Sequence, residues 1–191
     1  MKYDKVTRWL HAGTALGITL QLVLSLVMEV PEPGAPVGGI AGTLYHAHAT
    51  LGLAVFGLLG MHWLWQLSGH TTDGMGHLFP WFAAPRRAAV GREMGQLVAS
   101  RLKQIPESGA LAGGVHGLGL LAATAMGATG TILYFGMGAD GSASPVVHAV
   151  KESHGFMATF MWIYLGGHGA MAALHQWSGR GAFSEMFDLR R

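Results

Sequence analysis

The chain has 191 residues, of which 50% are hydrophobic and only 12% are charged. Soluble domains carry about 25% charged residues, so this composition argues against an ordinary soluble protein. The 11 histidines stand beside a complete lack of cysteine. Without cysteine there can be no disulfide, thiolate zinc site, cysteine-bound iron–sulfur cluster or C-x-x-C-H haem attachment. Any metal chemistry must therefore use histidine, carboxylate or methionine.

Four segments without charge organise the sequence. Asp, Glu, Lys and Arg are absent between Arg8 and Glu29, Glu32 and Asp73, Glu107 and Asp140, and Glu152 and Arg180. Each segment can hold the ~20 apolar residues that a membrane-spanning helix needs. We predict an all-α integral membrane four-helix bundle, a single domain over residues 1–191, with helices near 9–28, 44–67, 111–136 and 153–176. A soluble bundle is disfavoured because its helices would need a polar outer face.

The basic residues predict the orientation in the membrane. Cytoplasmic loops are enriched in Lys and Arg. Eleven of the 12 basic residues precede the first segment, lie between the second and third, or follow the fourth, and only Lys151 lies elsewhere. Both termini and the connection 68–110 are thus predicted to be cytoplasmic, and the links 29–43 and 137–152 to face outward. The positive charge reflects topology and does not indicate nucleic-acid binding.

The cytoplasmic connection contains a candidate amphipathic helix within residues 86–103. Its apolar residues stand at helical spacing among cations: Val90, Met94, Leu97 and Val98. That pattern fits a helix lying on the inner membrane surface. A solvated loop is the alternative.

Two histidines of the fourth segment are the strongest functional signal. His154 and His168 are fourteen residues apart in a stretch without charge. In a helix they would share one face and lie roughly 21 Å apart along the axis, at about 1.5 Å per residue. The hydrocarbon core is about 30 Å thick. One helix therefore offers a metal ligand near each side of a membrane, and neutral imidazole suits haem iron.

The predicted depths suggest partners for these two ligands. The second helix begins at the outer face, which places His48 at the level of His154. For His168, in the inner half, spacing allows either His11 of the first helix or His62, which is fourteen residues after His48. The residues thus predict two haems at different depths, each held by two histidines, with the inner partner left open. Glycines in these segments would leave room for a flat macrocycle or simply permit close helix packing.

Short motifs along the chain carry a family resemblance. They are R-W-L-H-A-G at 8–13, H-A-T-L-G at 48–52, H-G-L-G-L at 116–120, G-A-T-G at 127–130, K-E-S-H-G at 151–155 and G-G-H-G-A at 166–170. Together they resemble the bacterial cytochrome b561 and nickel-hydrogenase/formate-dehydrogenase cytochrome b superfamily. Its members are four-helix, di-haem b membrane proteins that exchange electrons with quinone. By position, the resemblance implies His11 and His168 on the inner haem and His48 and His154 on the outer haem.

Further residues are candidates for secondary contacts to haem or quinone: Arg8, His62, His116 and His175. Some members of the superfamily carry arginine where His62 stands, so the resemblance implies a contact to a haem propionate or quinone there. His116 and His175 would border a quinone headgroup, or else be ordinary interfacial histidines.

The predicted function is transmembrane electron transfer through two b-type haems between a periplasmic redox partner and the quinone pool. The chain would be the cytochrome b subunit of a respiratory oxidoreductase in the bacterial inner membrane. Its partner would be a c-type cytochrome or a dehydrogenase- or hydrogenase-type subunit. The alternative is a stand-alone quinone-reducing cytochrome b561. A histidine-lined metal transporter and a cofactor-free structural subunit are disfavoured, because the candidate ligands form matched pairs at two depths. No catalytic residue is predicted.

Overall fold

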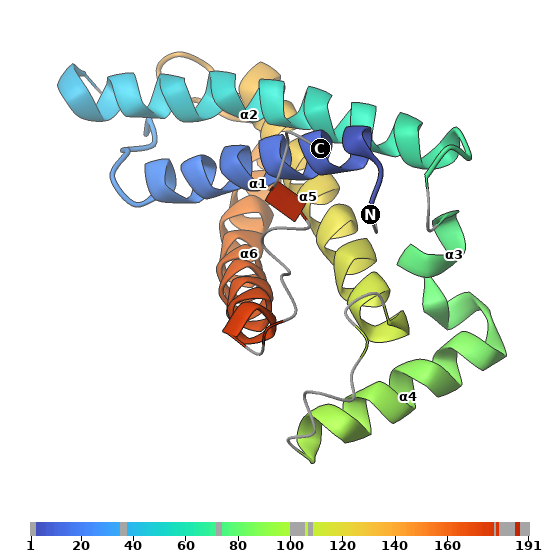
Figure 1. Ribbon diagram of the computed structural model, residues 1–191. Coiled ribbons are helices and arrows are strands. Elements are labelled where there is room, and N and C mark those ends of the chain that lie inside the picture. Colours follow the sequence, from blue (N-terminus) through green and yellow to red (C-terminus); the bar gives the residue numbers. More distant parts are fainter. Residues whose placement is uncertain are drawn as a thin grey trace. The chain divides into compact units, whose positions relative to one another are not determined.

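Every regular element of the computed structural model is a helix. It describes residues 3–34, 38–71, 74–99, 106, 109–177, 179 and 186–187. In chain order the elements are α1 (Lys5–Ser25), α2 (Gly39–Leu67), α3 (Gly74–Leu78), the 3-10 helix η1 (Pro80–Phe82), α4 (Ala84–Val98), α5 (Ala110–Gly136) and α6 (Pro145–Trp177) (Figure 1). The described residues form no sheet, which confirms the all-α class.

The four charge-free segments coincide with the four long helices, but the ends differ. Helix α1 begins at Lys5 and not near residue 9, and α6 begins at Pro145 and not near residue 153. The reason is physical. A lack of charge marks residues that a membrane tolerates, whereas a helix ends where its hydrogen bonding ends. Proline suits the first turn of α6, because the N–H that it lacks would have no partner within the helix there.

Two helices are long and apolar enough to cross a membrane. Among the described residues, α2 with 29 residues and α5 with 27 meet these criteria of length and composition. Only 11% and 17% of their most apolar stretches are buried within the protein, whereas the core helix of a soluble protein would be mostly buried. Helices α1 and α6 do not meet the same criteria, so four spans remain a prediction.

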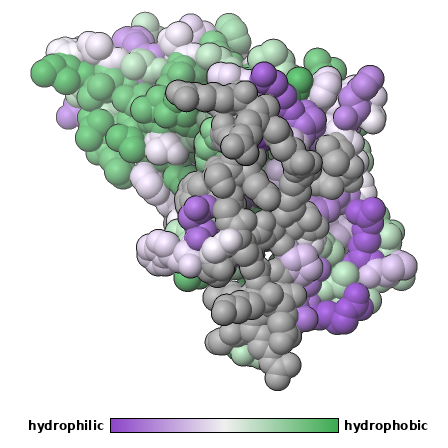
Figure 2. Space-filling view, in the orientation of Figure 1, coloured by the Kyte–Doolittle hydropathy of each residue, from purple (hydrophilic) through white to green (hydrophobic). Residues whose placement is uncertain are grey.

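Large apolar side chains are exposed on these helices. Leu16 is 63% exposed, Leu26 is 68% exposed and Ile40 is 81% exposed. Figure 2 shows a broad hydrophobic surface where Figure 1 places the second half of α1 and the first half of α2. Soluble monomers rarely expose contiguous apolar patches larger than a few hundred Å². The surface fits contact with lipid.

The chain forms two compact units. The first unit comprises Met1–Ala12, Met61–Leu121 and Leu165–Arg191, and the second comprises Gly13–Gly60 and Ala122–Tyr164. Each of the four long helices contributes residues to both units. The candidate ligands divide between them, with His11, His62, His116 and His168 in the first unit and His48 and His154 in the second.

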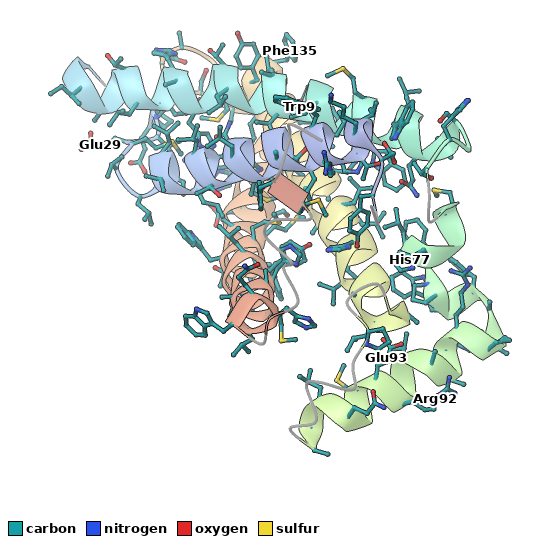
Figure 3. All side chains as sticks on the ribbon, in the orientation of Figure 1. Trp9, Glu29, His77, Arg92, Glu93 and Phe135 are labelled. Carbon is teal, nitrogen blue, oxygen red and sulfur yellow. The ribbon has the colours of Figure 1, made fainter. Side chains whose placement is uncertain are left out.

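In the first unit, helix α4 is tied to the start of α5 by a buried carboxylate. Glu93 accepts hydrogen bonds from the backbone N–H groups of Ala110, at 3.2 Å, and Leu111, at 2.8 Å. It caps α5 from another helix, satisfying N–H groups that have no partner within α5 (Figure 3). The described part of the predicted cytoplasmic connection thus contains α3, η1 and α4, and α4 covers most of the predicted amphipathic stretch.

Glycines of α5 allow the preceding segment to approach very closely in the same unit. A Cβ atom on Gly113 would collide with the backbone oxygen of His77, and one on Gly117 would collide with that of Leu78. Gly114 faces Pro80, whose Cγ atom would lie 3.1 Å from an added Cβ atom. These contacts explain part of the glycine content without any bound group.

Candidate functional site

The second unit brings His48 of α2 and His154 of α6 together. Their ring centroids are 6.4 Å apart and their planes stand at 89°. Both residues line a cavity of about 680 Å³, whose walls also include Gly52, Gly127 and Gly130. Cofactor and ligand sites have volumes of about 300–1,000 Å³. We call these two residues the outer pair, after the depth that the sequence predicts for them.

The ring of His48 is oriented by helix α1. Its Nδ1 atom lies 3.2 Å from the backbone oxygen of Gln21. A carbonyl oxygen can only accept, so Nδ1 carries the hydrogen and Nε2 keeps the lone pair. The side-chain amide of Gln21 in turn donates to the backbone oxygen of His48 at 2.8 Å. Two hydrogen bonds therefore join the same two residues, and Gly52 leaves space for the amide, since a Cβ atom there would lie 3.1 Å from it.

The ring of His154 is oriented by helix α5. Its Nδ1 atom lies 2.8 Å from the hydroxyl oxygen of Thr129, and that hydroxyl lies 2.8 Å from the backbone oxygen of Ala125. With the hydroxyl hydrogen on the Ala125 oxygen, the Thr129 oxygen accepts from Nδ1–H, and Nε2 of His154 then keeps its lone pair. Metal-binding histidines usually donate their other ring N–H in this way.

The first unit gathers three imidazoles from three helices, which we call the inner cluster: His11 of α1, His116 of α5 and His168 of α6. Ring centroids are 6.2 Å apart for His11 and His168, 6.4 Å for His11 and His116, and 5.1 Å for His116 and His168. Nδ1 of His11 is buried and has no hydrogen-bond partner among the described residues. Within those residues, no group of three or more His, Cys, Asp or Glu is arranged to hold a metal ion.

The secondary candidates also lie in the first unit. Arg8 is almost fully buried, with 2% of its surface exposed. Nδ1 of His62 is buried without a hydrogen-bond partner in the part of the chain that the structure describes. His175 lies in the last turn of α6. Phe187 lies 5.7 Å from His11, ring centroid to ring centroid.

A family model decides the class of this protein. The model, described as prokaryotic cytochrome b561, matches residues 2–188. The chain belongs to the prokaryotic cytochrome b561 family. This membership confirms the resemblance predicted from the ordered motifs. It assigns the chain to the membrane-integral b-type cytochromes, which bind haem and transfer electrons across the membrane. No curated protein and no solved structure matches the chain significantly.

A cytochrome b561 family member binds haem, so the separations between its histidine rings can be compared with that of two imidazoles on one iron. A metal–nitrogen bond to imidazole is about 2.1 Å long, and the ring centre lies about 1.1 Å beyond that nitrogen. Two imidazoles on opposite sides of one iron would therefore have ring centroids about 6.4 Å apart. The outer pair stands at 6.4 Å and His11–His168 at 6.2 Å. His11–His116 also matches at 6.4 Å, whereas His116–His168 is too close at 5.1 Å.

Sequence reasoning on this cytochrome b561 family member missed the residues that orient the outer pair. Thr129 and Gln21 are intramembrane polar residues by the predicted boundaries. Gln21 is the only amide of its charge-free segment, and Thr129 lies in the motif G-A-T-G. Each was therefore a visible exception to an apolar pattern. The capping role of Glu93 gave no such signal, because it depends on how α4 packs.

Proposed function

We propose that this protein is a di-haem cytochrome b that carries electrons across the membrane between a periplasmic redox partner and the quinone pool. One observation carries the proposal. His48 and His154 face one cavity at the spacing of axial ligands, and the Nδ1 atom of each ring is engaged by a neighbouring helix. Both rings thus offer Nε2 to iron. A b-type haem bound there would supply one-electron redox chemistry at its iron.

The second haem is assigned to the inner cluster, with His11 and His168 as axial ligands. Their centroid separation of 6.2 Å and the buried, unbonded Nδ1 of His11 support this assignment. The family resemblance favours the same two residues. Secondary contacts to haem or quinone are assigned to Arg8, His62, His116 and His175. A guanidinium such as that of Arg8 suits a propionate, because it can donate two parallel hydrogen bonds to a carboxylate.

We assign the four long helices as membrane spans of the bacterial inner membrane, with both termini in the cytoplasm. The distribution of basic residues supports this orientation, as does the apolar character of α2 and α5. The outer pair would then serve a periplasmic c-type cytochrome or a dehydrogenase- or hydrogenase-type subunit. The inner cluster would serve quinone. The chain would act as the cytochrome b subunit of a respiratory oxidoreductase.

The test is a haem count on the detergent-purified protein. A reduced-minus-oxidised visible spectrum and a pyridine haemochrome assay should show two b-type haems per chain. One haem would mean that one of the two histidine sites is wrongly assigned. No haem in protein shown to be folded would overturn the proposal.

The role as a subunit is tested separately. We expect the purified chain to exchange electrons with quinol only slowly without a periplasmic donor or acceptor. A stable single polypeptide that turns over quinone without a partner would instead make it a stand-alone quinone reductase.

A further inference from the structure

Thr129 contacts one candidate haem ligand directly, and family membership does not account for this contact. We propose that Thr129 is a positioning residue for the outer haem. Its hydroxyl oxygen accepts the Nδ1–H hydrogen bond of His154, which sets the rotation of the imidazole and strengthens Nε2 as a ligand. This inference rests on the proposed function, since it presupposes that His154 binds iron.

Iron bound at Nε2 of His154 leaves the ring hydrogen on Nδ1, and the bonds that the Thr129 hydroxyl makes within its own helix match that direction. The hydroxyl of Thr129 lies 2.8 Å from the backbone oxygen of Ala125 and 3.0 Å from that of Met126. Both oxygens can only accept, so they take the single hydroxyl hydrogen. The 2.8 Å contact with His154 then runs from Nδ1–H to the hydroxyl oxygen. In the opposite tautomer the hydroxyl would have to turn its hydrogen away from these two oxygens toward Nδ1.

Helix α5 also restricts the position of the ring. A Cβ atom on Gly130 would lie 3.3 Å from Cε1 of His154, which is tighter than an ordinary contact. The imidazole therefore packs closely against the backbone of α5 at Gly130, while the neighbouring Thr129 fixes its rotation. His48 donates the corresponding bond to the backbone oxygen of Gln21, which a side-chain substitution does not remove. Of the two Nδ1 hydrogen bonds in the outer pair, the one to His154 involves a side chain, so substitution of Thr129 can remove it.

The hydrogen bond should lower the reduction potential of the outer haem. An acceptor on Nδ1–H increases the basicity of a coordinating imidazole, and a more basic ligand stabilises ferric over ferrous iron. In T129V a methyl group replaces the hydroxyl at nearly constant shape, so the acceptor is lost and the packing is kept. We expect the ferrous-to-ferric ratio of the outer haem to rise several-fold at a given applied potential. A tenfold change corresponds to about 59 mV for one electron.

The chain offers a matched control two residues further along α5. The hydroxyl of Thr131 makes the same kind of bond within the helix, to the backbone oxygen of Gly127 at 2.8 Å. T131V therefore removes an equivalent hydroxyl without touching the bond to His154. T129S keeps an acceptor oxygen at the original position. These variants separate loss of the histidine bond from a general effect of removing a hydroxyl from α5.

The experiment is a redox titration of the purified full-length haem protein, with electron paramagnetic resonance of its low-spin ferric signals. His154→Ala identifies which spectral component belongs to the outer haem. We expect T129V to raise the potential and shift the g-values of that component, or to lose it while the inner haem remains. T129S and T131V should resemble the unmutated protein.

Two results would overturn the inference. One is a T129V protein in which the spectral component of the outer haem has the same reduction potential and g-values as in the unmutated protein. The other is a T131V protein changed as much as T129V. Should the unmutated chain lack the component that depends on His154, the proposed function itself would fail, and this would be evident before any Thr129 variant is compared.

Discussion

The two groups of histidines differ in how their rings are held. The outer pair consists of two imidazoles, and each has its Nδ1 atom bound to an oxygen of a neighbouring helix. The inner cluster contains three imidazoles, and Nδ1 of His11 has no hydrogen-bond partner among the described residues. A ring held by a second hydrogen bond is preorganised for one ligand geometry. Neighbouring helices therefore preorganise both rings of the outer pair, whereas Nδ1 of His11 in the inner cluster has no such bond within the described residues.

The largest expected effect comes from removing one axial ligand of the outer pair. We expect His154→Ala to abolish the outer haem and retain the inner one, because the two sites use separate histidines. Pyridine haemochrome assay should show about half of the haem content. His148→Ala is the matched control, since His148 is exposed on the same helix. Retention of both haems in His154→Ala would disprove the outer assignment.

Substitution of the histidines of the first unit should affect haem content unequally. We expect His11→Ala and His168→Ala to lose the inner haem, and His62→Ala and His116→Ala to retain it with an altered spectrum. The reason is that His11 and His168 have the spacing of axial ligands and are favoured by the family resemblance. Haem quantitation on the four variants checks this expectation. Loss of haem from His116→Ala, with retention in His168→Ala, would make His116 the ligand opposite His11.

This contrast also shows how far the sequence predicts the structure. The positions of the four long helices follow from the charge-free segments, and the pairing of His48 with His154 follows from the membrane depths predicted for them. The inner cluster does not follow, since spacing alone left His11 and His62 open and did not place His116 5.1 Å from His168. Distances between helices depend on packing at particular glycines, and a linear pattern does not contain them. The same holds for Thr129, whose role depends on which face of α5 meets α6.

Packing around the outer pair can be tested at Gly127. A Cβ atom there would collide with the ring of Phe56, so Gly127→Ala should force α2 and α5 apart locally. We expect a loss of about 1–3 kcal/mol in stability, the usual effect of overpacking. Thermal unfolding in detergent, followed by loss of the haem spectrum, measures it. Gly155→Ala is the control, because no atom lies within 4 Å of its added Cβ atom. Equal stability of the two variants would contradict the packing described for the second unit.

The first unit depends on a polar contact at Glu93. Glu93→Ala removes the acceptor for the N–H groups of Ala110 and Leu111 at the start of α5. We expect a loss of about 1 kcal/mol, typical of a removed helix cap, and earlier protease cleavage near this segment. Arg92→Ala should have little effect, since Arg92 is exposed on the same helix. Limited proteolysis and thermal unfolding compare the two variants, and equal results would show that the cap contributes nothing measurable.

The smallest expected effect is a pH dependence at the start of α1. The carboxylate of Asp4 accepts hydrogen bonds from the backbone N–H of Thr7 at 2.8 Å, its hydroxyl at 2.6 Å and the indole N–H of Trp65 at 3.1 Å. Burial acts to raise the pKa of Asp4, but the bonds from Thr7 and Trp65 outweigh it and hold the pKa below its ordinary value of 3.8.

Because the folded protein lowers this pKa, Asp4 stabilises the fold fully above the ordinary value, and the stabilisation is lost as the pH falls through the lower, folded value. We expect the melting temperature of the unmutated protein to fall more steeply below pH 3.8 than that of Asp4→Asn, and to exceed it near neutral pH. The effect should be small, since Asp4 is only partly buried. Parallel curves of melting temperature against pH would show that the hydrogen bonds to Asp4 do not favour its ionised form. A steeper fall in Asp4→Asn would reverse the sign of the linkage and place the acid-sensitive group elsewhere in the first unit.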